Sequence, residues 1–144
     1  MVTSHAIVRA LDDAGYRLTE PRRRLAELIA AQPGHFSADS LFDESRRRHI
    51  GLTRATIFRS IEVLTRVGAI ERIDLPGGEH ALVACEALHH HHVVCSSCGR
   101  ATPVRDCGIV DAVTEIARRT GYRVDAHRVE IFGVCPDCQA ENPV

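Results

Sequence analysis

The sequence lacks a long apolar run, a strong net charge and any lysine. No stretch of about 18 apolar residues is present, which excludes a membrane-spanning helix. The N-terminus lacks the basic segment and apolar core of a secretory signal, so we expect a cytoplasmic protein. The formal net charge is -1 and all 18 basic residues are arginine, so the overall composition carries no strong electrostatic signature.

What is present is enough apolar material for a core and an uneven distribution of charge. The 144 residues are 44% hydrophobic, which suits one ordinary domain or two small ones. Residues 1–66 hold 11 Arg against 8 Asp and Glu, whereas the remainder holds 7 against 11. If either part binds nucleic acid, this balance favours the N-terminal one.

The N-terminal part shows helical periodicity followed by a hairpin pattern. Apolar spacing predicts helices near residues 7–14, 19–32, 37–48 and 53–68, with Thr19 and Ser37 as expected caps. The exposed face of the fourth helix would carry Arg54, Thr56 and Arg59. Two strand-like runs, 69–75 and 80–84, flank a Pro-Gly-Gly turn. Helices followed by such a wing indicate a winged helix-turn-helix, and a plain helical bundle with solvated arginines remains open.

The C-terminal part alternates strands with a helix. We expect a short strand at 101–104, a helix over 109–117 and a long strand over 124–134. That strand leads directly into a second C-x-x-C pair and a six-residue polar tail.

The stretch from residue 85 to residue 98 holds the densest set of potential metal ligands. It combines one thiol, four consecutive histidines and a C-x-x-C pair, which late first-row divalent metals prefer. Side chains alternate along a strand, so one strand could serve two metal sites. The two predicted pairs are His89 with His91, and His90 with His92.

Four of the six cysteines form two C-x-x-C pairs that are 36 residues apart. Four thiolates close a structural zinc site well, and each short turn lets both sulfurs reach one ion. A redox pair would need a helix N-terminus beneath it, which the polar tail fits poorly. We therefore predict a structural Zn²⁺ site made of Cys95, Cys98, Cys135 and Cys138.

Four motifs together resemble the ferric uptake regulator family of bacterial metal-dependent repressors, over nearly the whole chain. They are G-Y-R-L-T-E-P-R (15–22), H-F-S-A-D-S-L (35–41), T-R-A-T-I-F-R (53–59) and H-H-H-H-V-V-C-S-S-C-G (89–99). The resemblance implies an α+β protein, with a winged-helix DNA-binding domain over residues 1–84 and a small α/β dimerisation and metal-binding domain over 85–144. It also implies a homodimer that binds an inverted-repeat operator in double-stranded DNA and represses genes when a regulatory metal is bound.

By the same resemblance, several residues are expected to contact DNA. Arg17 matches a basic residue that reaches the minor groove, and Phe58 and Arg59 match the aromatic residue and arginine of the recognition helix. An arginine can read guanine with two hydrogen bonds or hold a phosphate, so the role of Arg54 and of Arg59 stays open.

The hinge metal site of the family takes a histidine from the winged-helix domain, matched by His35, and the second and fourth histidines of the run, here His90 and His92. The remaining ligand varies. Iron and peroxide sensors offer a carboxylate just before the run, whereas zinc sensors often place a cysteine there, which is Cys85 here. A thiolate with imidazoles favours zinc over iron(II) or manganese(II).

Four further positions bear on the subtype. The carboxylate positions of the peroxide sensor fall near Ala84 and on Pro103, which disfavours that reading. Glu86 could still supply an oxygen, and Glu71 matches an acidic position that some zinc sensors use in place of the histidine. Either of these, or His35, could therefore complete the hinge site.

A third family site uses His89, His91 and a late-strand histidine, matched by His127, together with a glutamate whose position is Val110 here. Asp111 or Cys107 could compensate, or the two run histidines could simply be exposed. Cys107 by itself is a small buried apolar residue in the plainer reading.

The resemblance therefore predicts a zinc-dependent repressor of zinc-uptake genes that is not an enzyme. An iron- or peroxide-responsive regulator of the same family is the alternative. A zinc hydrolase using Glu86 as its base, or a metal buffer that ignores DNA, would leave the recognition helix and wing unexplained.

Overall fold

The computed structural model describes residues 2–75, 77–85, 90–105 and 108–141. The chain divides into two compact units, residues 1–87 and 88–144. None of the described helices is long and apolar enough to cross a membrane.

The first unit begins with four helices, and side-chain caps fix the start of three of them. The hydroxyls of Thr3, Ser37 and Thr53 each accept a backbone N–H from the first helical turn, at 3.0 to 3.2 Å. Thr19 precedes its helix without a side-chain cap, and Pro21 occupies the first turn instead. The helices are α1 (Ser4–Asp13), α2 (Glu20–Ala30), α3 (Ala38–Arg47) and α4 (Arg54–Arg66).

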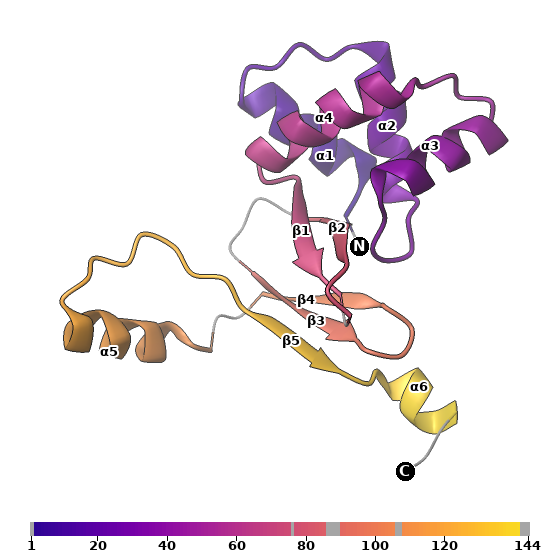
Figure 1. Ribbon diagram of the computed structural model, residues 1–144. Coiled ribbons are helices and arrows are strands. Elements are labelled where there is room, and N and C mark those ends of the chain that lie inside the picture. The colour runs from indigo at the N-terminus through magenta and orange to yellow at the C-terminus, as the bar shows by residue number, and fades with distance from the viewer. Residues whose placement is uncertain (1, 76, 86–89, 106–107, 142–144) are drawn as a thin grey trace. The chain divides into compact units, whose positions relative to one another are not determined.

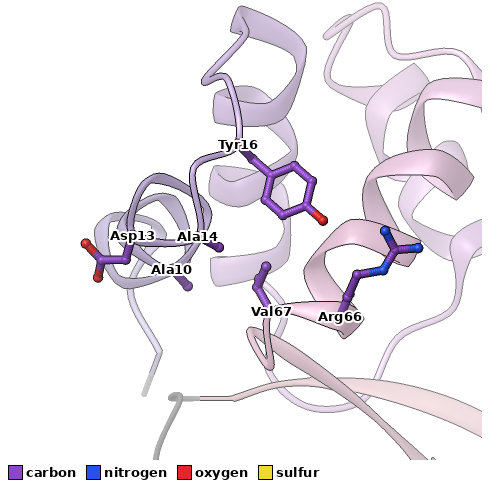
Figure 2. A pocket seen from close by; sticks show the side chains of 6 residues that line it. All are labelled: Ala10, Asp13, Ala14, Tyr16, Arg66 and Val67. Atoms are coloured by element: carbon purple, nitrogen blue, oxygen red, sulfur yellow. The ribbon is translucent and has the colours of Figure 1, made fainter.

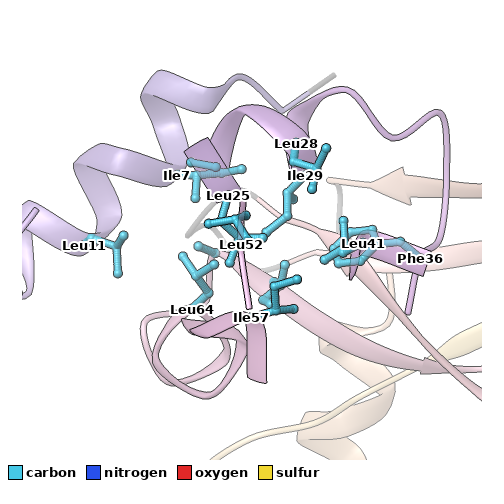
Figure 3. Packing of buried hydrophobic residues seen from close by; sticks show 13 residues of the cluster. Ile7, Leu11, Leu25, Leu28, Ile29, Phe36, Leu41, Leu52, Ile57 and Leu64 are labelled. Atoms are coloured by element: carbon cyan, nitrogen blue, oxygen red, sulfur yellow. The ribbon is translucent and has the colours of Figure 1, made fainter. Parts of the chain in front are cut away.

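One continuous apolar core holds these helices together (Figure 3). Each helix contributes residues at the predicted spacing, and most of them are at most 2% exposed. Burying one such side chain stabilises the fold by about 1.5–3 kcal/mol. The largest fully buried side chains of the helices are Ile7, Leu11, Leu25, Leu28, Ile29, Leu41, Ile57 and Leu64.

A two-stranded antiparallel wing follows, made of β1 (Ile70–Asp74) and β2 (His80–Ala84). Gly77 and Gly78 both adopt positive φ at its turn, a conformation that glycine adopts without strain. On its other edge β2 bonds to the segment before α3, because Phe36 and Leu82 exchange two backbone hydrogen bonds of 2.8 Å. Helices and hairpin together form the predicted winged helix-turn-helix (Figure 1).

The second unit contains a three-stranded sheet in the order β4-β3-β5 (Figure 1). The middle strand is antiparallel to β4 and parallel to β5. Gly121, at φ 72°, ends the helix that precedes β5. The elements are β3 (His91–Cys95), β4 (Ala101–Val104), α5 (Val110–Thr120), β5 (Glu130–Gly133) and α6 (Pro136–Glu141).

Two expectations for this unit are wrong. The strand predicted over 124–134 is only four residues long, because among the described residues β5 pairs only with the five-residue β3 and residues 124–129 pair with no strand. The second C-x-x-C does not lead only into a polar tail, because α6 begins at Pro136, directly after Cys135, and the Gln139 N–H donates to the Cys135 carbonyl at 2.9 Å.

Candidate metal centres and nucleic-acid interface

The sheet of the second unit brings the two C-x-x-C pairs together. Cys95 ends β3, and its register partner Gly133 ends β5 two residues before Cys135. Because the strands are parallel, the turns that follow them leave the sheet at the same edge. The sulfurs of Cys95, Cys98, Cys135 and Cys138 consequently all lie within 4.8 Å of one another.

Backbone geometry supports this cluster. The N–H groups of Cys98 and Cys135 both point at the Cys95 sulfur, at 3.5 and 3.3 Å. Gly99 closes the first turn at φ 72°, where a residue with a Cβ would be strained. An ion pair of 2.6 Å joins Arg100, just after that turn, to Asp137 inside the second C-x-x-C. These contacts orient the two turns toward each other, although the exposed ion pair by itself adds little stability.

The electrostatics of the four thiols call for a cation. Backbone donation from Cys135, and then from Cys98, lowers the pKa of Cys95 to about 6. The pKa of Cys138 is raised to about 12: its hydrogen bond with Ser97 lowers the pKa, but Cys135, Cys98, burial and Cys95 together raise it by more. Four thiolates this close repel one another unless a cation lies among them. A tetrahedral zinc ion fits this all-sulfur donor set.

The histidine run alternates between two faces, as the sequence predicts. The rings of His90 and His92 lie 4.8 Å apart, and that of His91 lies 5.1 Å from His127 of the segment before β5. His91 and His92 are both buried. His89, predicted as the partner of His91, lies outside the described residues.

Within the first unit, the wing presents a second set of ligand candidates on one face. The bridge between Phe36 and Leu82 puts His35 beside Val83, and Glu71 is the partner of Val83 on β1. Directly opposed residues share a face, so His35 and Glu71 flank Val83 on the face away from the helical core.

Cys85 continues the same face two residues after Val83. Its N–H donates to the Ala69 carbonyl at 2.9 Å, and its thiol, which is 4% exposed, contacts the Val83 carbonyl. The next candidate ligands of the described chain, His90 and His92, belong to the second unit. Four residues separate Cys85 from His90, so the chain connection itself keeps them within reach. Glu86, the other oxygen donor considered, lies outside the described residues.

The third predicted site has the least support. Val110 begins α5 and is 54% exposed, so the position of the family glutamate carries no ligand. Asp111 follows in the first turn of α5. Cys107 lies outside the described residues. Of the described candidates for this site, His91 and His127 are in ring contact.

The residues expected to contact DNA lie on α4 and in the loop before α2. Phe58 is 53% exposed although it is a large apolar residue, and Arg54 and Arg59 are exposed beside it. Thr56 is half-buried and donates its N–H to the cap Thr53. Arg17 is exposed in the loop, where its carbonyl accepts a 2.6 Å hydrogen bond from Arg22.

A groove of about 480 Å³ lies between the end of α1 and the end of α4 (Figure 2). In Figure 2, Asp13 and Arg66 lie at opposite sides of it, and Tyr16 points across it. Its polar groups do not converge on one point, and it contains none of the predicted site residues.

Comparison with known proteins identifies this combination of wing, histidine strand and cysteine cluster. Residues 13–132 match the model of the ferric uptake regulator family. The chain belongs to that family. It is 36% identical over 129 residues to the zinc uptake regulation protein of Mycobacterium tuberculosis, covering 88% of this chain and 98% of the relative.

Solved structures agree with this membership of the ferric uptake regulator family. The ferric uptake regulator of Vibrio cholerae is 29% identical, with a TM-score of 0.64 over 88% of this chain and 98% of that one. A zinc uptake regulator complexed with zinc and DNA superimposes with a TM-score of 0.78 over the full length of both chains. Its identity is 20%, so it speaks for the fold alone. The predicted α+β architecture, a winged helix followed by an α/β domain, is confirmed.

Sequence reasoning missed the supporting residues around these family sites. Arg100 and Asp137, which clamp the cysteine turns, are 37 positions apart. Asp39 and Phe42, which contact Arg54, belong to a different helix. Only Arg22 could have been found from the sequence, because it lies in the same motif as Arg17. Its side chain donates to the Arg17 carbonyl.

Proposed function

We propose that the protein is a zinc-dependent, DNA-binding transcriptional repressor that controls zinc-uptake genes. The observation that carries this proposal is the buried Cys85, which continues the wing face of His35 and Glu71 and lies next in sequence to the paired His90 and His92. One thiolate with two imidazoles is a set of ligands suited to zinc. The similarity to the zinc uptake regulation protein of Mycobacterium tuberculosis supports the same reading.

Two metal roles are separated in this proposal. The cysteine cluster holds a structural Zn²⁺, because its four sulfurs leave no open position for a regulator to sense. Cys85, His90 and His92 hold the regulatory ion. His35 or Glu71 supplies the fourth ligand, since both flank Val83 on the face that Cys85 continues.

The regulatory effect follows from where the ligands originate. His35, Glu71 and Cys85 belong to the winged-helix unit, whereas His90 and His92 belong to the other. A bound ion supplies a cross-link between them. The winged helices then occupy fewer arrangements, and those matching successive major grooves become more populated. Linkage requires that metal and DNA strengthen each other's binding by the same factor.

We assign DNA contact to Arg17, Arg54, Thr56, Phe58 and Arg59, which lie in the loop before α2 and on α4. We also propose a cytoplasmic homodimer without enzymatic activity. Its support is the large apolar side chains that the second unit leaves exposed, among them Val110, Ile116, Ile131 and Phe132. A homodimer presents two recognition helices, which suits an inverted repeat.

An iron- or peroxide-responsive regulator is the alternative within the family. A carboxylate from Glu71 in place of His35 would make the hinge site richer in oxygen, but the Cys85 thiolate still favours zinc. The 29% identity to the ferric uptake regulator of Vibrio cholerae is compatible with either metal.

The deciding experiment selects bound sequences from a random duplex pool with the full-length protein. It is run at buffered high and low free zinc, with iron(II) and manganese(II) in parallel. We expect an inverted repeat that is enriched only with zinc. Enrichment with iron(II) or manganese(II) instead would assign the protein to another subtype. The absence of enrichment under every metal would favour a metal buffer or an enzyme.

The ligand set is tested on the selected operator. We expect Cys85→Ser to weaken zinc-dependent binding at least tenfold while the structural zinc content stays unchanged, since second-shell changes alone cost about 10–100-fold in metal affinity. Comparing His35→Ala with Glu71→Gln identifies the fourth ligand. His80→Ala is the matched control, because His80 is an exposed wing histidine paired with Asp74. Unchanged zinc dependence in Cys85→Ser contradicts the hinge assignment.

A further inference from the structure

Arg54 is held by two residues of the neighbouring helix. Its Nη1 forms an ion pair with the Asp39 carboxylate in the first turn of α3. Its guanidinium carbon lies 4.4 Å from the centre of the Phe42 ring, one turn further along α3. An ion pair at one edge and an aromatic ring on one face together fix both the location and the plane of the guanidinium.

The position of Arg54 at the N-terminus of α4 is unfavourable for a positive charge. Arg54 is the first residue of α4, and the first turn of that helix contains no acid. A cation at this end is disfavoured by the helix dipole, so Arg54 would otherwise extend away into solvent. Asp39 supplies the missing negative charge from α3. The arginine is consequently kept at the start of the helix whose exposed face carries Phe58 and Arg59.

The held guanidinium keeps one edge for another acceptor. Asp39 engages Nη1, while Nε and Nη2 form the opposite edge, and the Arg54 side chain stays exposed despite its two contacts. The free edge offers two parallel N–H groups in a plane that is already fixed, which is the geometry with which an arginine reads guanine.

We propose that Asp39 and Phe42 are positioning residues that make Arg54 a base-reading residue rather than a phosphate contact. Asp39 also neutralises the charge of Arg54, which reduces its attraction to DNA of any sequence. The pair therefore raises specificity more than it raises affinity. This inference rests on the proposed DNA-binding function and assigns the open role of Arg54 within it.

The test repeats the duplex selection with full-length Asp39→Asn and Arg54→Lys, and then with the double variant. Lysine keeps the charge of Arg54 but loses its planar fork. We expect both single variants to lose preference at the same base pairs, by about tenfold for a lost two-bond contact to guanine. The double variant should lose no more than Arg54→Lys. Phe42→Leu should lose part of the same preference.

Affinity for a duplex without the operator separates positioning from structural support. We expect Asp39→Asn to bind such DNA as tightly as the wild type or a few-fold more tightly, because an acid near the phosphates is gone. Asp13→Asn, which removes an exposed acid from α1, is the matched control and should leave the selected motif unchanged.

Two outcomes overturn the inference. Asp39→Asn could select the wild-type motif with every preference intact, or it could lose operator and non-operator affinity in parallel. Failure of the proposed function is distinguishable from both, since the wild type itself would then select no motif with any metal.

Discussion

The two units of this chain are stabilised in different ways. Residues 1–87 contain a continuous apolar core to which all four helices contribute. In the described part of residues 88–144, the buried residues are confined to β3, and α5 buries none of its side chains. Three of the four buried residues on β3 are candidate metal ligands, namely His91, His92 and Cys95.

This difference indicates that the two units depend on different interactions to fold. The first unit has enough apolar burial to fold around its own side chains. The second combines a small sheet with a cysteine cluster and an apolar surface left exposed, so we expect it to need metal and a second copy. We therefore expect loss of zinc to unfold the second unit while the first unit stays folded.

The largest expected effect comes from removing the structural zinc. Cys95→Ala, or a strong chelator, should unfold residues 88–144 and abolish dimerisation, because structural zinc contributes about 10–16 kcal/mol in small metal-dependent folds. Amide NMR should then show dispersed signals from residues 1–87 alone. Ser96→Ala, an exposed neighbour in the same turn, is the control. If the second unit stayed folded without zinc, the two units would not differ in their need for metal, and the prediction would be wrong.

A smaller effect is expected from a cavity in the first unit. Leu25→Ala should lower the free energy of unfolding of residues 1–87 by about 2–5 kcal/mol, since Leu25 is fully buried. Chemical denaturation followed by NMR would measure this unit separately from the other. Phe58→Ala is the matched control: it removes a large but exposed side chain and should cost less than about 0.5 kcal/mol. A full zinc complement in Leu25→Ala would confirm that the second unit is stabilised independently.

The smallest effect is expected at the clamp between the cysteine turns. Asp137→Asn removes the ion pair between Asp137 and Arg100, two exposed side chains. The variant should therefore lose about 0–1 kcal/mol of stability, and the difference from the wild type should disappear at high salt. The rate at which the protein releases zinc to a calibrated chelator should be slightly higher for this variant than for the wild type. Asp125→Asn breaks another exposed pair in the same unit, with Arg123, and should leave zinc release unchanged. Equal effects of the two variants would show that the clamp has no special role.

Much of the first unit was predictable because its signals are local. Helical periodicity, the cap at Ser37 and the glycine turn of the wing all act within a few residues. The alternation of the histidine run was predictable for the same reason, since it follows from strand geometry alone.

The second unit was less predictable because its strands depend on distant partners. The sequence predicts a strand over residues 124–134, but only four of these residues form β5, because β3 is too short to pair with more of them. Thr19 shows the same limit on a smaller scale: its residue type permits a cap, but its side chain forms no cap hydrogen bond.

The sequence by itself determined which ligands the protein offers and how they are spaced. Ligand chemistry is a property of residue type, and the short C-x-x-C and histidine spacings are local. Only the tertiary structure decided which residues meet. Parallel pairing of β3 with β5 brings together thiols separated by 40 positions, and packing of α3 against α4 sets Asp39 and Phe42 on Arg54. Such contacts close long loops of the chain, which costs conformational entropy. The packing of the whole fold offsets this entropy, so no local sequence pattern predicts the contacts.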